Sequence, residues 1–225
     1  MSAAADGMRV AEQVVHDLRS GALDASLDSA VTALQEGHAV VFPTDTVAGL
    51  GVSVRHAPSP SEIFRIKHRD DGKPVAWLVA GPQALDEYGV DVPAEVKAMA
   101  RRFWPGPLTI IVKANECVPA AFASKQGTIG LRMPNSETAL RLINAVGNPL
   151  ATSSANISGE PSPGTVEEVS QDVRRAASSV IADASLPSGL ASTVVDCSSG
   201  SFRVLREGAI TSDMLLQVDG SSPSR

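Results

Sequence analysis

Apolar residues recur along this chain in two patterns, which alternate from about residue 27 onwards. Four apolar residues between 27 and 34 are spaced by three and four positions, so they share one face of a predicted helix. Gly37 follows this segment, at the kind of position where a helix ends in a left-handed residue. The apolar run 39–42 then predicts a buried strand, which Pro43 ends.

The same two patterns predict the rest of the secondary structure. Helices are expected over 10–18, 61–68, 93–103, 136–145 and 166–177, and strands over 75–79, 108–112, 129–133, 149–151, 180–182, 193–196 and 203–205. Some of these strands alternate with helices and others follow one another directly, which favours a mixed sheet over a purely parallel one. We therefore expect an α/β fold, a twisted mixed β-sheet with flanking helices. Residues 1–25 are expected to form a loosely ordered lead-in, 26–212 a single domain and 213–225 a C-terminal tail.

Composition narrows the class of protein. Of the 225 residues 43% are hydrophobic, and no apolar run approaches the roughly 18–20 residues that span a bilayer. The N-terminus lacks a basic segment followed by an apolar core, so no signal peptide is expected. Cys117 and Cys197 stand far apart without neighbouring metal ligands, so we expect two small buried apolar residues. Together these features predict a cytoplasmic protein with no membrane attachment.

The charge balance argues against a broad nucleic-acid-binding face. The formal net charge is −6, whereas a domain that binds nucleic acid over a broad face is normally basic. Only 4% of residues are aromatic, so few side chains can stack on single-stranded bases. A local basic cleft is still compatible with this sequence, because its lysines and arginines cluster in a few short segments.

The segment PLATSSANISG, residues 149–159, carries the densest group of small polar side chains. They follow a short apolar run, and the carboxyl end of a strand is where open α/β sheets hold ligands. Hydroxyls and a carboxamide at this density suit an anionic, oxygen-rich ligand. The alternative is an ordinary Ser/Asn/Gly loop between a strand and a helix.

A second candidate segment is PTDTVAGLG, residues 43–51. Thr44 and Thr46 point the same way if the chain is extended, and the glycines permit close approach of the backbone to a ligand. The alternative is a corner whose Asp and Thr side chains satisfy local backbone groups.

A third candidate segment is KHRDDGK, residues 67–73. In an extended chain Lys67 and Arg69 would converge on one phosphate or carboxylate, which a guanidinium fork and an ammonium group both bind. The alternative is a solvated charged turn.

Further polar residues occupy predicted strands. Arg132 lies among apolar neighbours and needs a partner or a ligand there, while Arg206 ends a strand where it could anchor a phosphate. The sequence contains no GxxxxGK[ST], GxGxxG, GxSxG or HExxH motif. A nucleotide site would therefore have to be built from scattered Ser, Thr, Asn, Lys and Arg residues.

Taken in order, these segments resemble the YrdC family of threonylcarbamoyl-adenylate synthases over about residues 27–210. The resemblance is carried by PTDTVAGLG, the Lys67-x-Arg69 pair, WPGPLT, TIGLRMP, TSSANISG, STVVD and RVLREGAI. It implies a YrdC-like catalytic domain of the short form, in which the sheet surrounds a large basic cavity.

The resemblance also implies a reaction. A nucleotidyltransferase of this family joins L-threonine, bicarbonate or CO2, and ATP, with Mg2+, into threonylcarbamoyl-AMP and pyrophosphate. The product serves the threonylcarbamoyl modification of adenosine 37 in tRNA, which implies a threonylcarbamoyl transferase complex and tRNA or double-stranded RNA as partners.

Each site residue is implied by its place in a matching motif. Lys67 and Arg69 would be catalytic and hold phosphate and the carbamate or carboxylate. The substrate would be bound by Thr44, Thr46 and Arg132, and the nucleotide by Ser154, Asn156, Thr193 and Arg206.

Two residues depart from the family pattern. Ala48 stands where the family usually has Tyr, which removes an aromatic wall and a hydroxyl from the threonine side. Asp70 stands where the family usually has Pro, and an acid there would compete for the Arg69 guanidinium. These departures leave open a paralogue with another acceptor. A second alternative comes from the resemblance itself, a double-stranded RNA-binding or ribosome-maturation protein of the same fold. A carbamoyl-adenylate enzyme of hydrogenase maturation would normally need fused zinc-finger domains, which this chain lacks.

Overall fold

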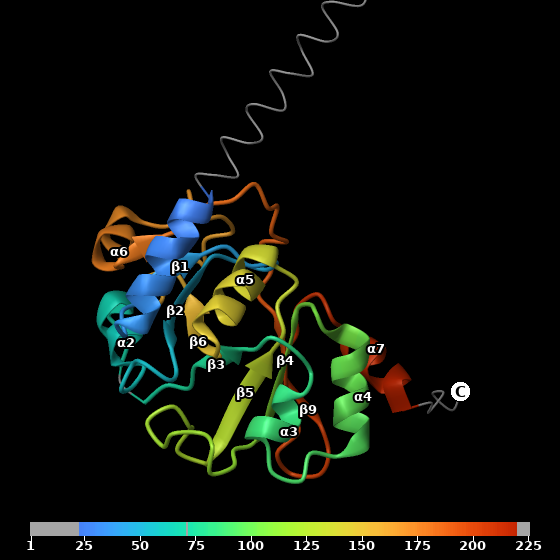
Figure 1. Cartoon of the computed structure of the whole chain (residues 1–225). Helices are drawn as coiled ribbons and strands as arrows, with labels where there is room; N and C mark the ends of the chain where they lie inside the picture. The colour runs from blue at the N-terminus through green and yellow to red at the C-terminus, as the bar shows by residue number, and fades with distance from the viewer. Residues whose placement is uncertain (1–22, 71, 220–225) are drawn as a thin grey trace, which may run out of the picture.

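The chain folds around one mixed β-sheet, which a computed structural model describes for residues 23–70 and 72–219 (Figure 1). The strand order is β7-β1-β2-β6-β3-β5-β4-β8-β9. The strands are β1 (Val40–Phe42), β2 (Gly49–Ser53), β3 (Ala76–Leu78), β4 (Leu108–Lys113), β5 (Thr128–Arg132), β6 (Leu150–Ser154), β7 (Ser179–Val180), β8 (Thr193–Asp196) and β9 (Arg203–Arg206). The pairs β1–β7, β3–β5 and β4–β8 are parallel and the others are antiparallel. The predicted mixed sheet with flanking helices is confirmed.

Helices flank the sheet, and local sequence sets several of their ends. They are the helical segment 23–35, α2 (Ser61–Lys67), α3 (Ala84–Tyr88), α4 (Ala94–Phe103), α5 (Glu137–Val146), α6 (Gln171–Ala176) and α7 (Ser212–Leu216), with a 3-10 turn over Gln217–Asp219. The Ser136 hydroxyl caps α5 by accepting from the Ala139 N–H at 3.3 Å, and Gly147 ends that helix at a φ of 74°. No helix in the described part of the chain is long and apolar enough to cross a membrane.

Two apolar clusters lie on opposite faces of the sheet. Successive residues of one strand join different clusters: Val41 belongs to one, and Val40 and Phe42 belong to the other. Side chains alternate between the faces of a sheet, so the two clusters must be separated by it. The segment 23–35 and α5 cover the face of Val40 and Phe42, and both lie in front of β1, β2 and β6 in Figure 1. The core is therefore built in two layers.

Several elements differ from the sequence prediction. Strand β6 extends to Ser154 instead of ending at 151, because its polar residues pair with β2, a strand that no apolar run had predicted. The helix predicted over 166–177 shortens to α6, which Ser170 begins as its cap. Helices α3 and α7 were not predicted, Cys117 is exposed instead of buried, and the helix predicted over 10–18 lies outside the described residues.

The glycines of β2 serve packing within the sheet. A Cβ on Gly51 would lie 2.9 Å from Thr152 Oγ1 and 3.1 Å from the Phe42 ring. A Cβ on Gly49 would lie 3.2 Å from the Thr152 methyl group and 3.3 Å from the same ring. Phe42 and Thr152 therefore occupy the space that a side chain at Gly49 or Gly51 would need.

Gly208 offers a test of the tight connection after β9. A Cβ there would lie 2.3 Å from the Ala191 carbonyl oxygen and 2.7 Å from the Thr193 nitrogen, and backbone atoms cannot rotate away. We expect Gly208→Ala to lower the free energy of unfolding by about 3 kcal/mol or more, measured by urea unfolding.

The matched control is Gly164→Ala, where the nearest atom is a Glu168 carboxylate oxygen 3.3 Å away on a flexible side chain. That variant should stay within about 0.5 kcal/mol of the wild type. Equal losses in the two variants would contradict the packing described at Gly208.

Candidate functional site

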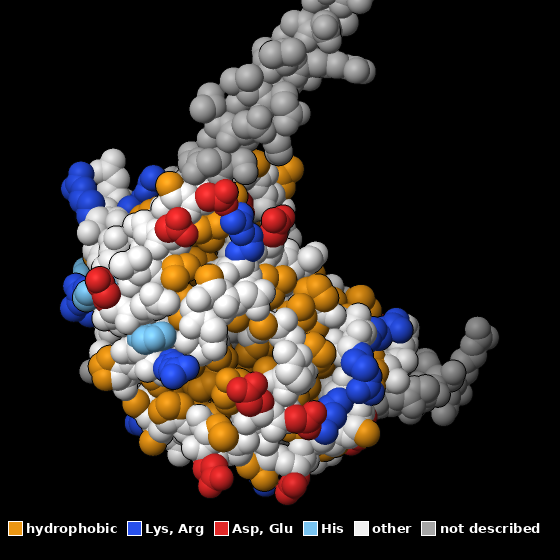
Figure 2. All heavy atoms as spheres, viewed as in Figure 1, with side chains coloured by type: hydrophobic (Ala, Val, Ile, Leu, Met, Phe, Trp, Pro, Cys, Tyr) orange, Lys and Arg blue, Asp and Glu red, His pale blue; other side chains and the backbone are white. Residues whose placement is uncertain are grey.

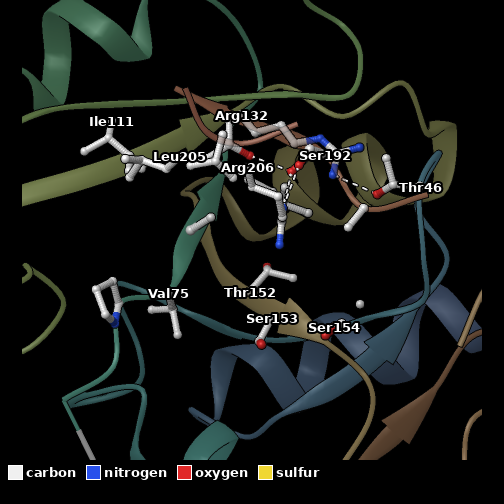
Figure 3. A pocket seen from close by; sticks show the side chains of 18 of the residues that line it. Thr46, Val75, Ile111, Arg132, Thr152, Ser153, Ser154, Ser192, Leu205 and Arg206 are labelled. Carbon is white, nitrogen blue, oxygen red and sulfur yellow. Dashed lines mark hydrogen bonds between the residues drawn. The ribbon is translucent and has the colours of Figure 1, made fainter. Parts of the chain in front are cut away.

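A cavity of about 620 Å³ opens over one face of the sheet (Figure 3). Its floor contains Ala76, Gly130 and Ile111, which lie side by side on β3, β5 and β4, and Thr152, which pairs with Ala76 from β6. Their strand neighbours, among them Trp77, point to the opposite face and fill the core. Mostly small or hydroxyl-bearing residues on one face thus leave room for a ligand.

Apolar side chains lie towards one end of the cavity, among polar lining residues that include Thr128 and Asp196. Figure 3 shows Arg132, Arg206, Ser192 and Thr46 on one side of it and Thr152, Ser153 and Ser154 on the opposite side, with Val75, Ile111 and Leu205 towards one end. The charged lining residues are Arg69, Arg132, Arg203, Arg206 and Asp196. Four guanidinium groups against one carboxylate favour an anionic ligand.

Arg132, at the end of β5, is held by three acceptors. Its Nε donates to the Gly106 carbonyl at 3.0 Å, its Nη1 to Thr46 Oγ1 at 2.9 Å, and its Nη2 to the Asp45 carboxylate. The side chains of Arg132 and Asp45 are only 7% and 13% exposed. Burial lowers the pKa of Arg132 and the charge of Asp45 opposes this, so the guanidinium stays charged. These bonds leave one N–H on each terminal nitrogen for a ligand.

Arg206, at the end of β9, forms a second guanidinium site. Its Nε donates to the Ser192 carbonyl at 3.0 Å and its Nη2 to Ser192 Oγ at 3.2 Å. Ser192 Oγ also lies 2.9 Å from Thr109 Oγ1 on β4. Burial lowers the pKa of Arg206, and its charge also lowers the pKa of Arg132, so the two guanidinium groups act on the same region.

Arg69 forms the third site, against the end of β6. Its Nη1 donates to Ser153 Oγ at 3.2 Å and its Nη2 to the Pro74 carbonyl at 3.1 Å, and its guanidinium carbon lies 5.8 Å from the centre of the Phe64 ring. Asp70 does not compete for this guanidinium, because its carboxylate pairs with Lys73 Nζ at 3.2 Å. Burial lowers the pKa of Arg69.

Lys67 lies behind the cavity wall. It is 3% exposed, and its Nζ donates to the Ser154 carbonyl, to the Asn156 carbonyl at 2.6 Å and to Asn156 Oδ1 at 3.0 Å. The next residue, His68, is left-handed at a φ of 48°, so Lys67 and Arg69 do not follow one extended chain. Burial, and then the charge of Arg69, lower the pKa of Lys67 to about 8.

Thr44 and Thr46 do face the same region. Their hydroxyl oxygens lie 3.1 Å apart, and Thr44 Oγ1 also donates to the Val47 carbonyl at 2.6 Å. Ala48 beside them is fully buried. Its N–H donates to the Pro163 carbonyl at 3.0 Å and its carbonyl accepts from the Ala155 N–H at 2.9 Å, so its backbone joins the start of β2 to two loops.

The predicted site residues fall into two groups. Those that line the cavity are Thr44, Thr46, Arg69, Arg132, Ser154 and Arg206. The structure places Lys67, Asn156 and Thr193 outside the lining, and their polar groups bind the protein itself. Thr193 is fully buried and donates to the Ile210 carbonyl at 2.6 Å while it accepts from the Gly208 N–H at 2.8 Å.

Sequence reasoning did not single out Asp45, Ser153 or Thr109 as functional residues. Asp45 had a sequence signal, since a carboxylate between two threonines suits a buried cation as partner. The partners of Ser153 and Thr109, Arg69 and Ser192, are distant in sequence, so no local pattern predicts those contacts.

The side chains of the described residues do not form a metal site made of protein ligands alone. In the described part of the chain no three His, Cys, Asp or Glu residues cluster to hold an ion. Asp196, the one carboxylate among the described lining residues, accepts from Ser198 Oγ at 2.7 Å and from Arg203 at 3.4 Å. The lining residues are compatible with Mg2+ only if the ion binds together with a nucleotide and is coordinated mainly by its phosphate oxygens, which is a common mode of Mg2+ binding.

The fold and the site define a class: an α/β protein with an arginine-lined cavity on one face of a mixed sheet. A family model described as telomere recombination, that of the Sua5, YciO and YrdC proteins, matches residues 32–208. The chain belongs to the Sua5/YciO/YrdC family.

Three known proteins show how close the similarity is. A threonylcarbamoyl-AMP synthase of Pyrococcus abyssi is 35% identical over 83% of this chain and 55% of its own length. A putative threonylcarbamoyl-AMP synthase of Mycobacterium tuberculosis strain H37Rv is 32% identical over 85% of this chain and 88% of its own. The crystal structure of P. abyssi Sua5 complexed with L-threonine matches with a TM-score of 0.81 and 34% identity, over 86% of this chain and 57% of that one. The chain thus spans little more than half the length of the P. abyssi relative.

The buried pair of Asp45 and Arg132 generates a stability prediction. Removing the carboxylate leaves Arg132 charged and buried without its counter-ion. We expect Asp45→Ala to lower the free energy of unfolding by about 3–5 kcal/mol, measured by urea unfolding. Asp70→Ala is the control, since the Asp70 and Lys73 side chains are 87% and 50% exposed and their pair should contribute less than about 1 kcal/mol. An Asp45 variant as stable as the control would contradict the role of the pair.

Lys67 generates a prediction about pH. Its pKa falls from 10.5 to about 8 on folding, so between these values the unfolded chain binds more protons than the folded one. The free energy of unfolding of the wild type, taken relative to Lys67→Met, should therefore rise from pH 8 to pH 10.5 and stay level below pH 8. Urea unfolding at stepped pH measures it, and a flat difference across this window would show that Lys67 keeps its ordinary pKa.

Proposed function

We propose that this protein is a threonylcarbamoyl-AMP synthase, a nucleotidyltransferase that joins L-threonine, bicarbonate or CO2, and ATP and releases pyrophosphate. The observation that carries the proposal is the cavity itself: Arg69, Arg132 and Arg206 gather at hydroxyl-lined walls, and the apolar side chains of Val75, Ile111 and Leu205 lie towards one end. Such a cavity suits a ligand with two anionic groups and a flat apolar ring, as ATP and an amino acid together provide. The names of the relatives support the same activity.

The guanidinium groups would divide between the two anionic parts of the substrates, the threonine carboxylate and the triphosphate. Arg132 has two free N–H groups beside Thr46, which suits the threonine carboxylate. Arg69, in the loop after α2, and Arg206, at the end of β9, both border the cavity and would hold the triphosphate between them. The base would then lie near the apolar side chains of Ile111 and Leu205.

The chemistry needs no nucleophile from the protein. The threonine nitrogen takes up CO2 and releases a proton, and an oxygen of the resulting carbamate attacks the α-phosphate. A P–O bond forms as the bond to the β-phosphate oxygen breaks, and pyrophosphate leaves with its electron pair. The protein contributes alignment of the two substrates and stabilisation of the charge that develops on phosphate. Bound with the nucleotide, Mg2+ would neutralise part of the phosphate charge.

The product would be used for tRNA modification, with a threonylcarbamoyl transferase complex as the partner. Two cysteines that form no disulfide suit a reducing compartment such as the cytoplasm. The alternative of an RNA-binding module has less support: on the face shown in Figure 2, Lys and Arg side chains of the described residues are mixed with Asp and Glu instead of forming one broad basic patch.

Product analysis tests the activity. Incubation with ATP, bicarbonate and each candidate amino acid in turn, followed by mass spectrometry, should yield the threonylcarbamoyl adenylate and pyrophosphate with threonine alone. The same panel tests a different acceptor, which the replacement of the usual Tyr by Ala48 motivates. Salt-dependent binding of double-stranded RNA without pyrophosphate release would overturn the proposal.

The guanidinium sites generate a prediction for activity. We expect Arg206→Ala to lower kcat/KM by about 100-fold or more, as loss of a preorganised charged donor does. Arg101→Ala is the matched control, since Arg101 is exposed on α4, and it should retain wild-type kinetics. Pyrophosphate-release assays on both variants decide this, and an unchanged Arg206 variant would remove Arg206 from the site.

A further inference from the structure

Among the four guanidinium groups that line the cavity lies one carboxylate. Asp196, on β8, is the only Asp or Glu among the described lining residues, and the proposed reaction makes no use of it. Its side chain is 19% exposed, so solvent screens its charge only in part. A negative charge at this depth opposes the binding of any phosphate group that comes close to it.

Strand pairing fixes where Asp196 lies in the cavity. Asp196 is opposite Ile111 on β4 and opposite Arg203 on β9. Leu205 on β9 also lines the cavity, and Figure 3 shows it towards the same end as Ile111. These four residues form one corner of the cavity, which we call the β8 corner.

The guanidinium groups proposed to bind the triphosphate lie elsewhere. Arg206 is opposite Val194, two residues before Asp196, which is a displacement of about 7 Å along β8. Arg69 binds Ser153 at the end of β6, and in the strand order β6 and β8 are separated by β3, β5 and β4, with about 4.8 Å between neighbouring strands. A triphosphate held between Arg69 and Arg206 therefore extends away from the β8 corner.

The Asp196 carboxylate is held by local donors and is charged at neutral pH. Its Oδ1 accepts from Ser198 Oγ at 2.7 Å and from the Ser198 N–H at 3.0 Å. The hydrogen bond from the Ser198 hydroxyl is the main cause that lowers the pKa of Asp196. The carboxylate therefore has a fixed position and a full negative charge.

Arg203 compensates this charge only weakly. Its Nη2 lies 3.4 Å from Asp196 Oδ2, and its side chain is 75% exposed. An ion pair so open to water is weak. The β8 corner thus combines a fixed negative charge, an exposed positive charge and two apolar side chains, a set that suits an uncharged group better than a phosphate.

We infer that Asp196 is a specificity-determining residue that keeps phosphate groups out of the β8 corner by charge repulsion. A nucleotide can then bind in one direction only, with its uncharged base in the corner and its triphosphate towards Arg69 and Arg206. The inference rests on the proposed function, which supplies the nucleotide. It gives the one carboxylate of the described lining a role that no arginine can fill.

Competition between two fragments of the nucleotide tests the inference. The probes are adenosine and inorganic pyrophosphate, and calorimetry measures the affinity of each alone and in the presence of the other. In the wild type the two fragments occupy different parts of the cavity, so saturating pyrophosphate should change adenosine affinity by less than about 2-fold. In Asp196→Asn, pyrophosphate affinity should rise by about 10-fold, and saturating pyrophosphate should weaken adenosine binding by about 10-fold.

A matched control separates the local charge from the net charge. The asparagine oxygen of Asp196→Asn can still accept from Ser198, and thermal unfolding checks that the variant is folded. Asp172→Asn removes the same charge from an exposed residue on α6 that does not line the cavity. Its pyrophosphate affinity should stay within about 2-fold of the wild type, because solvent screens the Asp172 charge. Equal affinities in the two variants would overturn the inference, and so would displacement of adenosine by pyrophosphate in the wild type.

Arg203 supplies a second readout. Once residue 196 is uncharged, the Arg203 guanidinium is free to bind phosphate in the β8 corner. Adding Arg203→Gln to Asp196→Asn should therefore reverse most of the gain in pyrophosphate affinity. A gain that persists would overturn the inference, because the additional phosphate would then lie outside the corner.

The wild type separates this inference from the proposed function. If it binds neither adenosine nor pyrophosphate, the proposed function is itself wrong and the inference falls with it. If it binds both and the Asp196 variant matches it, the inference alone is overturned.

Discussion

Each central strand of the sheet serves two environments, because successive side chains point to opposite faces. On β3, the buried Trp77 fills the core while Ala76 leaves space above the other face. The same division recurs on β5, where Leu131 is buried and Gly130 lies in the cavity floor. The cavity depends on this alternation, since a shift of one residue in any central strand would turn large apolar side chains into it.

A second constraint is that Arg69, Arg132 and Arg206 must be held in place at the cavity wall. Arg69 and Arg206 are anchored by carbonyl and hydroxyl oxygens, which fix a guanidinium group but carry no formal charge. Arg132, the most buried of the three, is the one bound to a carboxylate. Burial opposes the charge of each of these three arginines, and the deepest of them, Arg132, is the one that has a counter-ion, so Arg69 and Arg206 keep their charge for a ligand.

Local sequence predicted the elements and the segments of the site better than the roles of single residues. Motif order brought Thr44, Thr46, Arg69, Arg132, Ser154 and Arg206 to one cavity. The assumption of an extended chain through residues 67–69 was wrong, because α2 continues to Lys67 and His68 turns the chain. The length of β6 also escaped prediction, since its polar half is a strand only through its pairing with β2, about a hundred residues away.

The two departures from the family pattern have different consequences in three dimensions. Asp70 pairs with Lys73 at the surface, so Arg69 keeps the same neutral anchors that a proline at 70 would leave it. Ala48 acts through its backbone, which ties β2 to Pro163 and Ala155, and any residue type other than proline can make those bonds. What Ala48 changes is therefore the shape of the cavity beside Thr46, the side on which the amino acid would lie. A smaller side chain there bears on which amino acid fits, while the guanidinium and hydroxyl groups that would hold carboxylate and phosphate stay in place.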